Sequence, residues 1–201
     1  MRLLITGGAG FIGSYLVDKL SEDKNNEVII FDNFHRGKKE KISQALKKNN
    51  VKLIEGDIRS PEDIEKIGEV DFIYHLAAQS NVADAEEDPD YTISSNIGGT
   101  YNLLKFASEN KVKGFLFSSS REVYGNPEYI PVDELHPLNP INFYGATKVS
   151  GEMLCKAFQS KYGLKVSVIR IANVYGPRDI GRVIPIFIKN IKLRGQYHST
   201  A

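Results

Sequence analysis

Short apolar runs alternate with longer amphipathic stretches along most of the chain. Most of the runs are apolar throughout, a pattern typical of strands buried on both faces of a parallel sheet. The runs predict strands over residues 2–6, 27–32, 51–57, 71–77, 114–120 and 165–172. The stretches between them predict helices over residues 11–21, 61–68, 91–110, 143–162 and 182–194. This alternation of strand and helix favours an α/β fold with a doubly wound parallel sheet.

Two polar segments interrupt the alternation. Residues 35–50 are rich in lysine, and we interpret them as a solvated loop with a short helix, with a phosphate-binding patch as the alternative. Residues 126–140 contain four prolines. They predict an extended surface segment, because proline disrupts both helices and sheets.

Composition narrows the class of protein. A chain of 201 residues can form one domain with a substantial core. Its net charge of +1 gives no reason to expect nucleic acid or a membrane as a partner. The single cysteine, Cys155, cannot form an internal disulfide, and we find neither a signal peptide nor an apolar run long enough to span a membrane. We therefore expect a cytoplasmic protein, and we assign no metal ligands.

The N-terminal sequence "LLITGGAGFIG" contains closely spaced glycines after an apolar strand. Gly8, Gly10 and Gly13 match the dinucleotide-binding pattern G-x-G-x-x-G, and Gly7, Gly10 and Gly13 give a second spacing. Glycine is needed here because the chain turns sharply and its backbone must approach a pyrophosphate closely. The pyrophosphate would then lie at a helix N-terminus, where unpaired N–H groups favour an anion.

An acidic residue ends the next predicted strand. Asp32 lies 19 residues after Gly13, where a carboxylate accepts hydrogen bonds from ribose hydroxyls and repels a 2′-phosphate. We therefore expect NAD, although Arg36 lies close enough to leave NADP open. Asp57, after the third strand, is placed to contact adenine, with a turn residue as the alternative.

Tyr144 and Lys148 share one face of a predicted helix, since they are four positions apart. A free phenol is a poor base at neutral pH, with a pKa of ~10. An ammonium ~4 Å away contributes ~4 kcal/mol at an effective dielectric of ~20, which lowers that pKa substantially. A serine hydroxyl at the end of strand 114–120 could bind the same substrate oxygen, because ligands of such sheets lie at the carboxyl ends of the strands.

Several motifs together resemble one family. "TGGAGFIG", "DIRS", "HLAAQSNV", "NIGGTYNLL", "FSSSREVYG", "FYGATK" and "RIANVYGPR" are similar to those of the extended short-chain dehydrogenase/reductase family. Within it, the chain most resembles nucleotide-sugar epimerases of the UDP-glucose 4-epimerase type. The resemblance implies an NAD-binding Rossmann domain over residues 1–201. It also implies that residues 182–201 begin a substrate-binding lobe that is largely missing.

The resemblance also implies roles for individual residues. Ser120 would be the catalytic serine, Tyr144 the base, and Lys148 the residue that lowers the tyrosine's pKa and holds the nicotinamide ribose. The predicted cofactor contacts are Gly7, Gly10, Phe11, Ile12, Gly13, Asp32, Asn33, Asp57, Ile58, Leu76, Ala77, Ala78, Asn96, Ser118, Tyr144 and Lys148. The predicted sugar-nucleotide contacts are Ser80, Ser120, Asn173 and Arg178. Asn96 would support the active-site helix, although Asn96 and Asn173 could equally be cap or turn residues.

The implied reaction is a 4-epimerisation of a UDP-sugar or another nucleoside-diphosphate sugar. Tyr144, as a phenolate, would take the proton of the sugar 4-hydroxyl while hydride leaves C4 for the nicotinamide. The resulting 4-keto sugar would rotate and take the hydride back on its other face. The cofactor is regenerated in each turnover, so it would stay tightly bound.

Glu122 leaves two further activities open. Sugar-nucleotide 4,6-dehydratases and UDP-glucuronate decarboxylases resemble "S-x-E-V-Y-G" more closely, with this glutamate as an acid-base group. Dehydratases usually place an aspartate immediately before it, where this chain has Arg121. We therefore favour the epimerase. Glu122 could equally be a surface residue paired with Arg121 or Lys148.

Two further expectations concern the whole chain. A module that binds NAD without turnover is an alternative, because relatives continue for roughly another hundred residues by resemblance. Helices 91–110 and 143–162 could pair across a two-fold axis in a homodimer with a four-helix interface, or their apolar faces could pack on the sheet.

Overall fold

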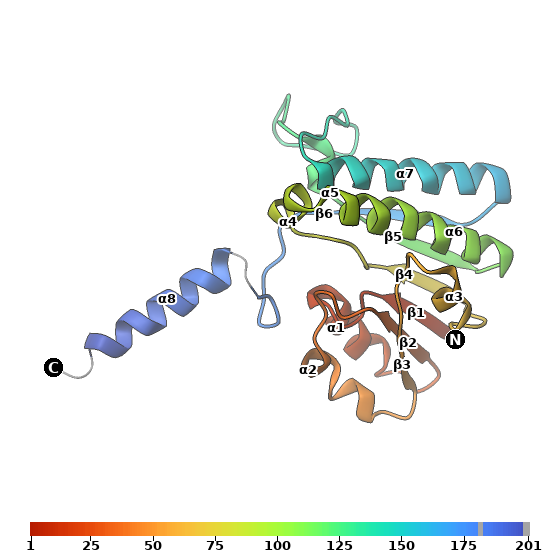
Figure 1. Ribbon diagram of the computed structural model, residues 1–201, viewed down its shortest axis with the longest axis horizontal. Helices are drawn as coiled ribbons and strands as arrows, with labels where there is room; N and C mark the ends of the chain where they lie inside the picture. The colour runs from red at the N-terminus through yellow and green to blue at the C-terminus, as the bar shows by residue number, and fades with distance from the viewer. Residues whose placement is uncertain (181–182, 199–201) are drawn as a thin grey trace.

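Six parallel strands form one sheet in a computed structural model that describes residues 1–180 and 183–198 (Figure 1). The strands are β1 (Arg2–Thr6), β2 (Glu27–Asp32), β3 (Val51–Glu55), β4 (Phe72–His75), β5 (Gly114–Ser120) and β6 (Val166–Ile171). Their order is β3-β2-β1-β4-β5-β6, and every neighbouring pair is parallel. This order reverses direction between β1 and β4, which confirms the doubly wound Rossmann sheet.

Helices lie between consecutive strands, and a further helix follows β6. They are α1 (Phe11–Leu20), α2 (Lys39–Ile42), α3 (Pro61–Glu65), α4 (Val82–Glu87), α5 (Pro89–Ile93), α6 (Thr100–Glu109), α7 (Phe143–Tyr162) and α8 (Val183–His198). Two 3₁₀ turns, η1 (Ala45–Lys47) and η3 (Arg121–Tyr124), and a π-helical segment, η2 (Ser94–Gly99), complete the described part. The helix predicted over 91–110 is therefore α5, η2 and α6 in succession.

The sequence pattern missed helix α4. This helix has six residues and begins after Asn81, whose side-chain oxygen accepts a hydrogen bond from the Ala83 amide over 2.8 Å. Such a short helix shows too little periodicity to be recognised, although an asparagine before it is a typical N-cap.

Helix α7 begins where a side chain caps it. The Asn142 side-chain oxygen accepts a hydrogen bond from the Gly145 amide over 2.7 Å. The helix ends before Gly163, which has a φ of 68° in the left-handed region. The N-cap places Tyr144 in the first turn of the helix, at the carboxyl end of the sheet.

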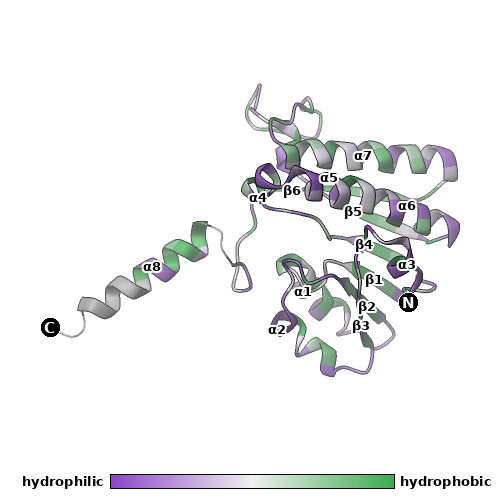
Figure 2. Ribbon diagram, viewed as in Figure 1, coloured by the Kyte–Doolittle hydropathy of each residue, from purple (hydrophilic) through white to green (hydrophobic). Residues whose placement is uncertain are grey.

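Two apolar clusters cover the two faces of the sheet. On one face, Leu4 and Phe117 lie in a cluster with Leu104 of α6 and Phe158 of α7. On the other face, Ile5 and Val28 pack with residues of α1 and α2. Figure 1 shows α6 and α7 on the opposite side of the sheet from α1 and α2, and Figure 2 shows the hydrophobic strands between them. Burial on both faces explains why the strands are apolar throughout.

Helix α8 extends away from the sheet (Figure 1), and Phe187 and Ile191 are exposed on it. The predicted start of a substrate-binding region falls here, and its residues 182 and 199–201 lie outside the described part of the chain. Tyr101 of α6 and Met153 of α7 are also exposed, so the four-helix dimer stays a prediction. Within the described residues, no helix is both long and apolar enough to cross a bilayer.

Candidate functional site

A cavity of about 780 Å³ lies at the carboxyl ends of the strands, next to the point where the strand order reverses. Ligands of open α/β sheets bind at this position, and the volume falls within the usual range of ligand sites. The cavity joins the end of β2 at one side to β5, α7 and the segment after β6 at the other. The residues that line the cavity therefore come from both halves of the chain.

The turn between β1 and α1 forms one wall of the cavity. Gly7 has a φ of 71°, and a Cβ there would lie 2.7 Å from the Ala77 nitrogen. A Cβ at Gly13 would lie 2.2 Å from the Gly7 oxygen. Both positions therefore require glycine, the first for its backbone conformation and the second for close packing of the helix on the turn. The resulting N-terminus of α1 is open to the cavity.

Asp32 holds the glycine turn as well as lining the cavity. Its Oδ2 accepts a hydrogen bond from the Ala9 amide and its Oδ1 one from the Phe34 amide, each over 2.9 Å. Burial raises the pKa of the Asp32 carboxyl, and these two backbone hydrogen bonds act in the opposite direction. The sequence predicted the position of this acid but not its part in shaping the turn.

A second acid lies behind the predicted adenine end. Asp57 lies outside the cavity lining; Arg59 pairs with it over 2.7 Å and the Asn33 side chain donates to it over 2.9 Å. Burial alone would raise the pKa of Asp57, but the hydrogen bonds from Arg59 and Asn33 outweigh it and lower the pKa to about 2. Asp57 therefore orients Asn33, which does line the cavity.

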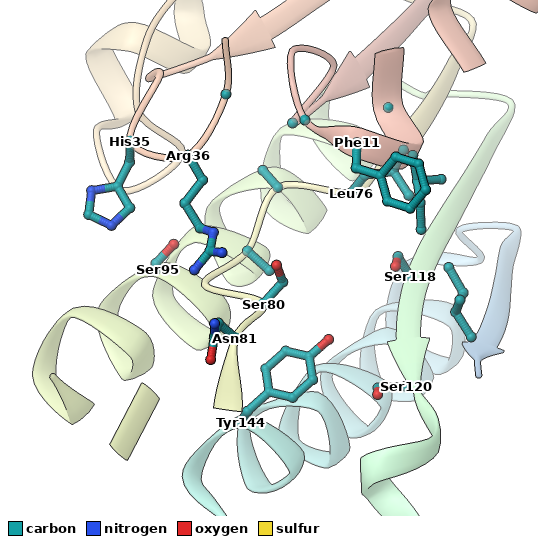
Figure 3. Close-up of a pocket in the computed structure, with 18 of the residues that line it drawn as sticks. Phe11, His35, Arg36, Leu76, Ser80, Asn81, Ser95, Ser118, Ser120 and Tyr144 are labelled. Atoms are coloured by element: carbon teal, nitrogen blue, oxygen red, sulfur yellow. The ribbon is translucent and has the colours of Figure 1, made fainter. Parts of the chain in front are cut away.

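The other end of the cavity collects the predicted catalytic residues. The Tyr144 phenol projects from α7 into the cavity, and Ser118 and Ser120 of β5 lie on the side facing it (Figure 3). The Lys148 Nζ lies 5.6 Å from the centre of the Tyr144 ring and donates a hydrogen bond to the Ser118 main-chain oxygen over 2.8 Å. Ser120 and Tyr144, which are 24 positions apart in the sequence, therefore face each other across this end of the cavity.

Lys148 is buried beneath this end of the cavity, with only 4% of its surface exposed. Burial lowers its pKa to about 8, because removing an ammonium from water disfavours the charged form. The Phe117 ring, whose centre is 5.1 Å from Nζ, forms part of the apolar surroundings. The lysine therefore titrates near the physiological range.

Glu122 also lines the cavity, one residue beyond Arg121. Its Oε1 pairs with Arg121 over 3.0 Å, and its Oε2 accepts a hydrogen bond from the Asn142 side chain over 3.0 Å. Arg121 also donates to the Asn173 side-chain oxygen over 3.3 Å. Both carboxylate oxygens thus have partners, as the surface-pair interpretation requires, while the side chain still reaches the cavity.

Asn96 lies beneath the cavity instead of on its wall. Its side chain accepts a hydrogen bond from the Gln79 amide over 2.8 Å and donates one to the Thr147 hydroxyl over 3.0 Å. Thr147 belongs to α7, so these bonds are what a residue supporting the active-site helix would make. Asn96 was also predicted as a cofactor contact, and its 2% exposure places it behind the residues that line the cavity.

Arg178 was predicted to contact the sugar nucleotide, and it also lies outside the lining. It pairs with Asp18 of α1 over 2.5 Å, and its guanidinium lies 4.5 Å from the centre of the Tyr15 ring. It thereby ties the segment after β6 to α1, while Asn173 of that segment lines the cavity.

The remaining predicted residues are brought together. From the first half of the chain, the cavity is lined by Gly7, Gly10, Phe11, Ile12, Gly13, Asp32, Asn33, Ile58, Leu76, Ala77, Ala78 and Ser80. From the second half, it is lined by Ser118, Ser120, Glu122, Tyr144, Lys148 and Asn173. Only Asp57, Asn96 and Arg178 of the predicted set lie behind or beside these residues.

Sequence reasoning missed a buried histidine below the glycine turn. His75 contacts the hydroxyls of Thr6 and Thr100 over 2.8 and 2.9 Å. Because Thr100 donates its own proton to the Asn96 main-chain oxygen over 2.6 Å, the Thr100 hydroxyl must accept from His75 Nε2, so Nδ1 accepts from Thr6. Burial lowers the pKa of His75 to about 3. This neutral histidine links β1, β4 and α6. The residues next to it in the sequence give no sign of these contacts.

Arg36 was considered only for its bearing on NADP. Its guanidinium lines the cavity, pairs with Asp84 of α4 and approaches the Gln79 side-chain oxygen at 3.4 Å. Figure 3 shows its guanidinium on the same side of the cavity as Ser95 of η2. The pairing with Asp84 offsets the positive charge of Arg36, which would otherwise attract a 2′-phosphate.

These residues fit an NAD molecule. The glycine turn leaves room for a pyrophosphate at the N-terminus of α1, and Asp32 borders the adjacent part of the cavity. Gly10 precedes α1 and has no side chain to cap its first amides, so those donors are directed at the cavity. Tyr144 and Lys148 lie at the opposite end, where a nicotinamide would be needed.

Comparisons with known proteins agree with this geometry. A family model described as "NAD dependent epimerase/dehydratase family" matches residues 3–199. A protein of Methanocaldococcus jannaschii named "Putative UDP-glucose 4-epimerase" is 42% identical over 193 residues, 92% of this chain and 61% of that protein. UDP-glucuronic acid decarboxylase 3 of Arabidopsis thaliana is 39% identical over 204 residues, 98% of this chain and 58% of that protein.

A solved structure is similar over nearly the whole chain. The structure of a dTDP-glucose 4,6-dehydratase from Streptomyces venezuelae with NAD bound has a TM-score of 0.91 and 33% identity, and the match covers 97% of this chain and 63% of that one. The chain thus spans about three fifths of the length of the relatives that it matches. The glycine turn, the tyrosine–lysine helix and these matches together show that the chain belongs to the NAD-dependent epimerase/dehydratase family.

Proposed function

We propose that the protein is an NAD-dependent nucleotide-sugar epimerase that inverts C4 of a UDP-sugar, of which UDP-glucose and UDP-galactose are the first pair to test. The observation that carries the proposal is the convergence of Tyr144, Ser120 and Lys148 at the end of the cavity remote from Asp32. A dinucleotide seated on the glycine turn would reach this end with its nicotinamide.

The protein's residues would divide the work of proton transfer. Tyr144 takes the proton of the sugar hydroxyl as a general base, and Ser120 donates a hydrogen bond to the same oxygen. Lys148 supplies a positive charge next to the phenol, which favours the ionised tyrosine. When bound, NAD supplies a reversible acceptor for the hydride that leaves the carbon bearing this hydroxyl. Epimerisation requires only that the keto sugar present its other face before the hydride returns.

Arg121 favours epimerisation over 4,6-dehydration. Dehydration needs an acid that protonates the departing 6-hydroxyl, and by family resemblance an aspartate provides it at this position. A guanidinium cannot give up its proton at neutral pH, because its pKa exceeds 12. Arg121 also pairs with Glu122 over 3.0 Å, so the neighbouring carboxylate is held by an ion pair before substrate arrives.

The direct test uses purified protein with NAD and UDP-glucose, and the product is analysed by chromatography. We expect UDP-galactose to form, and we expect Tyr144→Phe to lower turnover by a factor of at least ~10² while NAD stays bound. Activity that survives in Tyr144→Phe would refute the assigned base. NAD binding without affinity for any UDP-sugar would instead support the non-catalytic module.

A second candidate activity follows from the position of Glu122 in the cavity. As an acid-base group, it would serve a 4,6-dehydratase or a UDP-glucuronate decarboxylase, the activity named for the Arabidopsis relative. Deuterated water separates these reactions. An epimerase moves a hydride off C4 and back, so its product gains no deuterium on carbon. Elimination and decarboxylation both pass through an intermediate that takes a solvent proton at C5, so their products carry deuterium on that carbon.

A further inference from the structure

A buried carboxylate connects the catalytic helix to two strands. Glu152 lies on α7 on the same face as Tyr144 and Lys148, at four-residue intervals, and only 2% of its surface is exposed. Its Oε1 accepts hydrogen bonds from the Ser119 hydroxyl over 2.6 Å and from Arg170 Nε over 2.9 Å. Its Oε2 accepts one from an Arg170 terminal nitrogen over 2.8 Å. We call Glu152, Ser119 and Arg170 the Glu152 clamp.

The arginine of the clamp continues into the segment after the catalytic serine. Arg170 donates to the Tyr124 hydroxyl over 3.0 Å and to the Glu134 main-chain oxygen over 3.1 Å. Its guanidinium also lies 5.0 Å from the centre of the Tyr124 ring. Tyr124 ends the η3 turn that follows Ser120, and Glu134 belongs to the proline-rich segment. One guanidinium therefore ties both to β6.

The clamp lies directly behind the proposed reaction site. Lys148 bonds to the Ser118 oxygen over 2.8 Å, and one helical turn later Glu152 bonds to Ser119. Lys148 and Glu152, one turn apart on the same face of α7, thus bind two adjacent residues of β5. Ser120 is the next residue of that strand, so these bonds set how far its hydroxyl lies from the Tyr144 phenol.

The clamp is an ion pair with defined geometry. Burial alone would raise the pKa of Glu152, but the hydrogen bonds from Arg170 and Ser119 outweigh it and lower the pKa below its usual range. Replacing a buried ion pair by apolar residues of similar size is often neutral for stability, because desolvation offsets the attraction. What apolar residues cannot reproduce is the two-pronged geometry, which fixes the register of the helix against the strands.

We propose that the Glu152 clamp is a positioning device for the reaction: Glu152 and Arg170, without touching substrate, hold Tyr144 and Ser120 at the separation that proton transfer requires. This inference rests on the proposed function. It predicts that turnover depends on the clamp even when stability does not, because a small misplacement of reacting groups is costly to the rate.

A double-mutant cycle separates positioning from folding. Glu152→Met and Arg170→Met each leave one buried charge without its partner, so each should lower the melting temperature. The combined variant removes both charges and should regain most of the lost stability. We expect its kcat to stay about tenfold or more below that of the wild type, with KM and NAD affinity close to the wild-type values. A kcat that recovers together with stability would overturn the proposal.

A milder substitution covers the case in which the charge variants do not fold. Ser119→Ala removes one hydroxyl and leaves the ion pair, and it should lower kcat without changing NAD affinity. The matched control is Ser150→Ala on the same helix, because in the described part of the chain the Ser150 hydroxyl bonds to the Ala146 main-chain oxygen of its own helix and to no other element. Equal kcat values for the two alanine variants and the wild type would contradict a positioning role.

A measurement without turnover distinguishes failure of this inference from failure of the proposed function. Crystal structures of the wild type and of the combined variant give the distance between the Ser120 hydroxyl and the Tyr144 phenol. The clamp predicts that this distance changes in the variant by about 1 Å, a displacement large enough to lower the rate strongly. An unchanged distance overturns the clamp. If no sugar nucleotide reacts in the wild type, the proposed function fails, while this distance still decides the clamp.

Discussion

Lys148 donates a hydrogen bond from Nζ to the main-chain oxygen of Ser118 over 2.8 Å. This bond joins the first turns of α7 to the end of β5 and holds the ammonium 5.6 Å from the centre of the Tyr144 ring. A backbone oxygen is a fixed acceptor, so the position of the charge does not depend on a bound ligand. The fold itself therefore maintains the ammonium that the proposed proton transfer needs.

Burial of Lys148 predicts a particular dependence of stability on pH. Its pKa is lowered from 10.5 to about 8 in the fold, so between these values the unfolded chain binds a proton that the folded chain does not. The free energy of unfolding contributed by this group therefore rises as the pH increases from 8 to 10.5. Below pH 8 both states are protonated, and the cost of burying the ammonium is constant.

Urea unfolding of the wild type and Lys148→Met across this pH range checks the prediction. We expect the wild type to gain stability relative to the variant as the pH rises. The Cys155 thiol, whose pKa is raised to about 12 by burial, acts in the opposite direction above pH 9 but is present in both proteins. Parallel curves for the two proteins would show that Lys148 does not titrate in this way.

The glycine turn predicts a strong effect of one methyl group. In Gly13→Ala, the new Cβ would lie 2.2 Å from the Gly7 oxygen, and backbone atoms cannot yield as a flexible side chain can. We expect a loss of ~1–3 kcal/mol in the free energy of unfolding and a loss of NAD binding. Denaturant unfolding and calorimetry with NAD measure the two effects. Gly98→Ala is the matched control, since its Cβ would meet nothing within 4 Å.

Local patterns predicted much of the fold and most of the cavity. The strands around Leu4 and Phe117 are apolar because both faces of the sheet are covered, and this is visible in the sequence alone. Gly13 and Asp32 were predictable because their spacing reflects one strand, one turn and one helix. The tyrosine and lysine were predictable because four-residue spacing places them on one face of a helix.

Contacts between distant segments could not be predicted in this way. Glu152 and Arg170 lie 18 positions apart on different elements, and they become neighbours because α7 packs on the sheet where β5 and β6 pair. His75 is one residue in an apolar strand, and its role depends on two threonines far away in the chain. Arg178 is the last residue of a recognisable motif, yet its partner Asp18 lies on α1. Such contacts depend on tertiary packing, which the spacing of apolar and polar residues along the chain does not reveal.

We expect the Asp32 carboxylate to favour the binding of NAD over NADP. In Asp32→Asn, one neutral amide oxygen replaces two carboxylate oxygens, so either the Ala9 or the Phe34 amide loses its acceptor and the other keeps an uncharged one. Hydrogen bonds to charged groups contribute ~1.5–3 kcal/mol, and we expect NAD affinity to fall by about tenfold or more. NADP should lose less, because the repulsion of its 2′-phosphate disappears. Calorimetry with both cofactors gives the ratio, and Asp71→Asn, immediately before β4 at the amino ends of the strands, is the control.

Glu122 decides between the proposed epimerase and the second candidate activity. Its carboxylate is already held by Arg121 and Asn142, so an epimerase needs it only as part of the cavity wall. We therefore expect Glu122→Gln to keep kcat within about tenfold of the wild type, since the amide can still accept from Asn142. General acid-base groups contribute ~10²–10⁴ in rate, so a loss of that size would assign Glu122 to the chemistry. Kinetics of Glu122→Gln beside Tyr144→Phe, on the same sugar nucleotide, makes the comparison direct, because the tyrosine variant shows what the loss of a true proton acceptor costs.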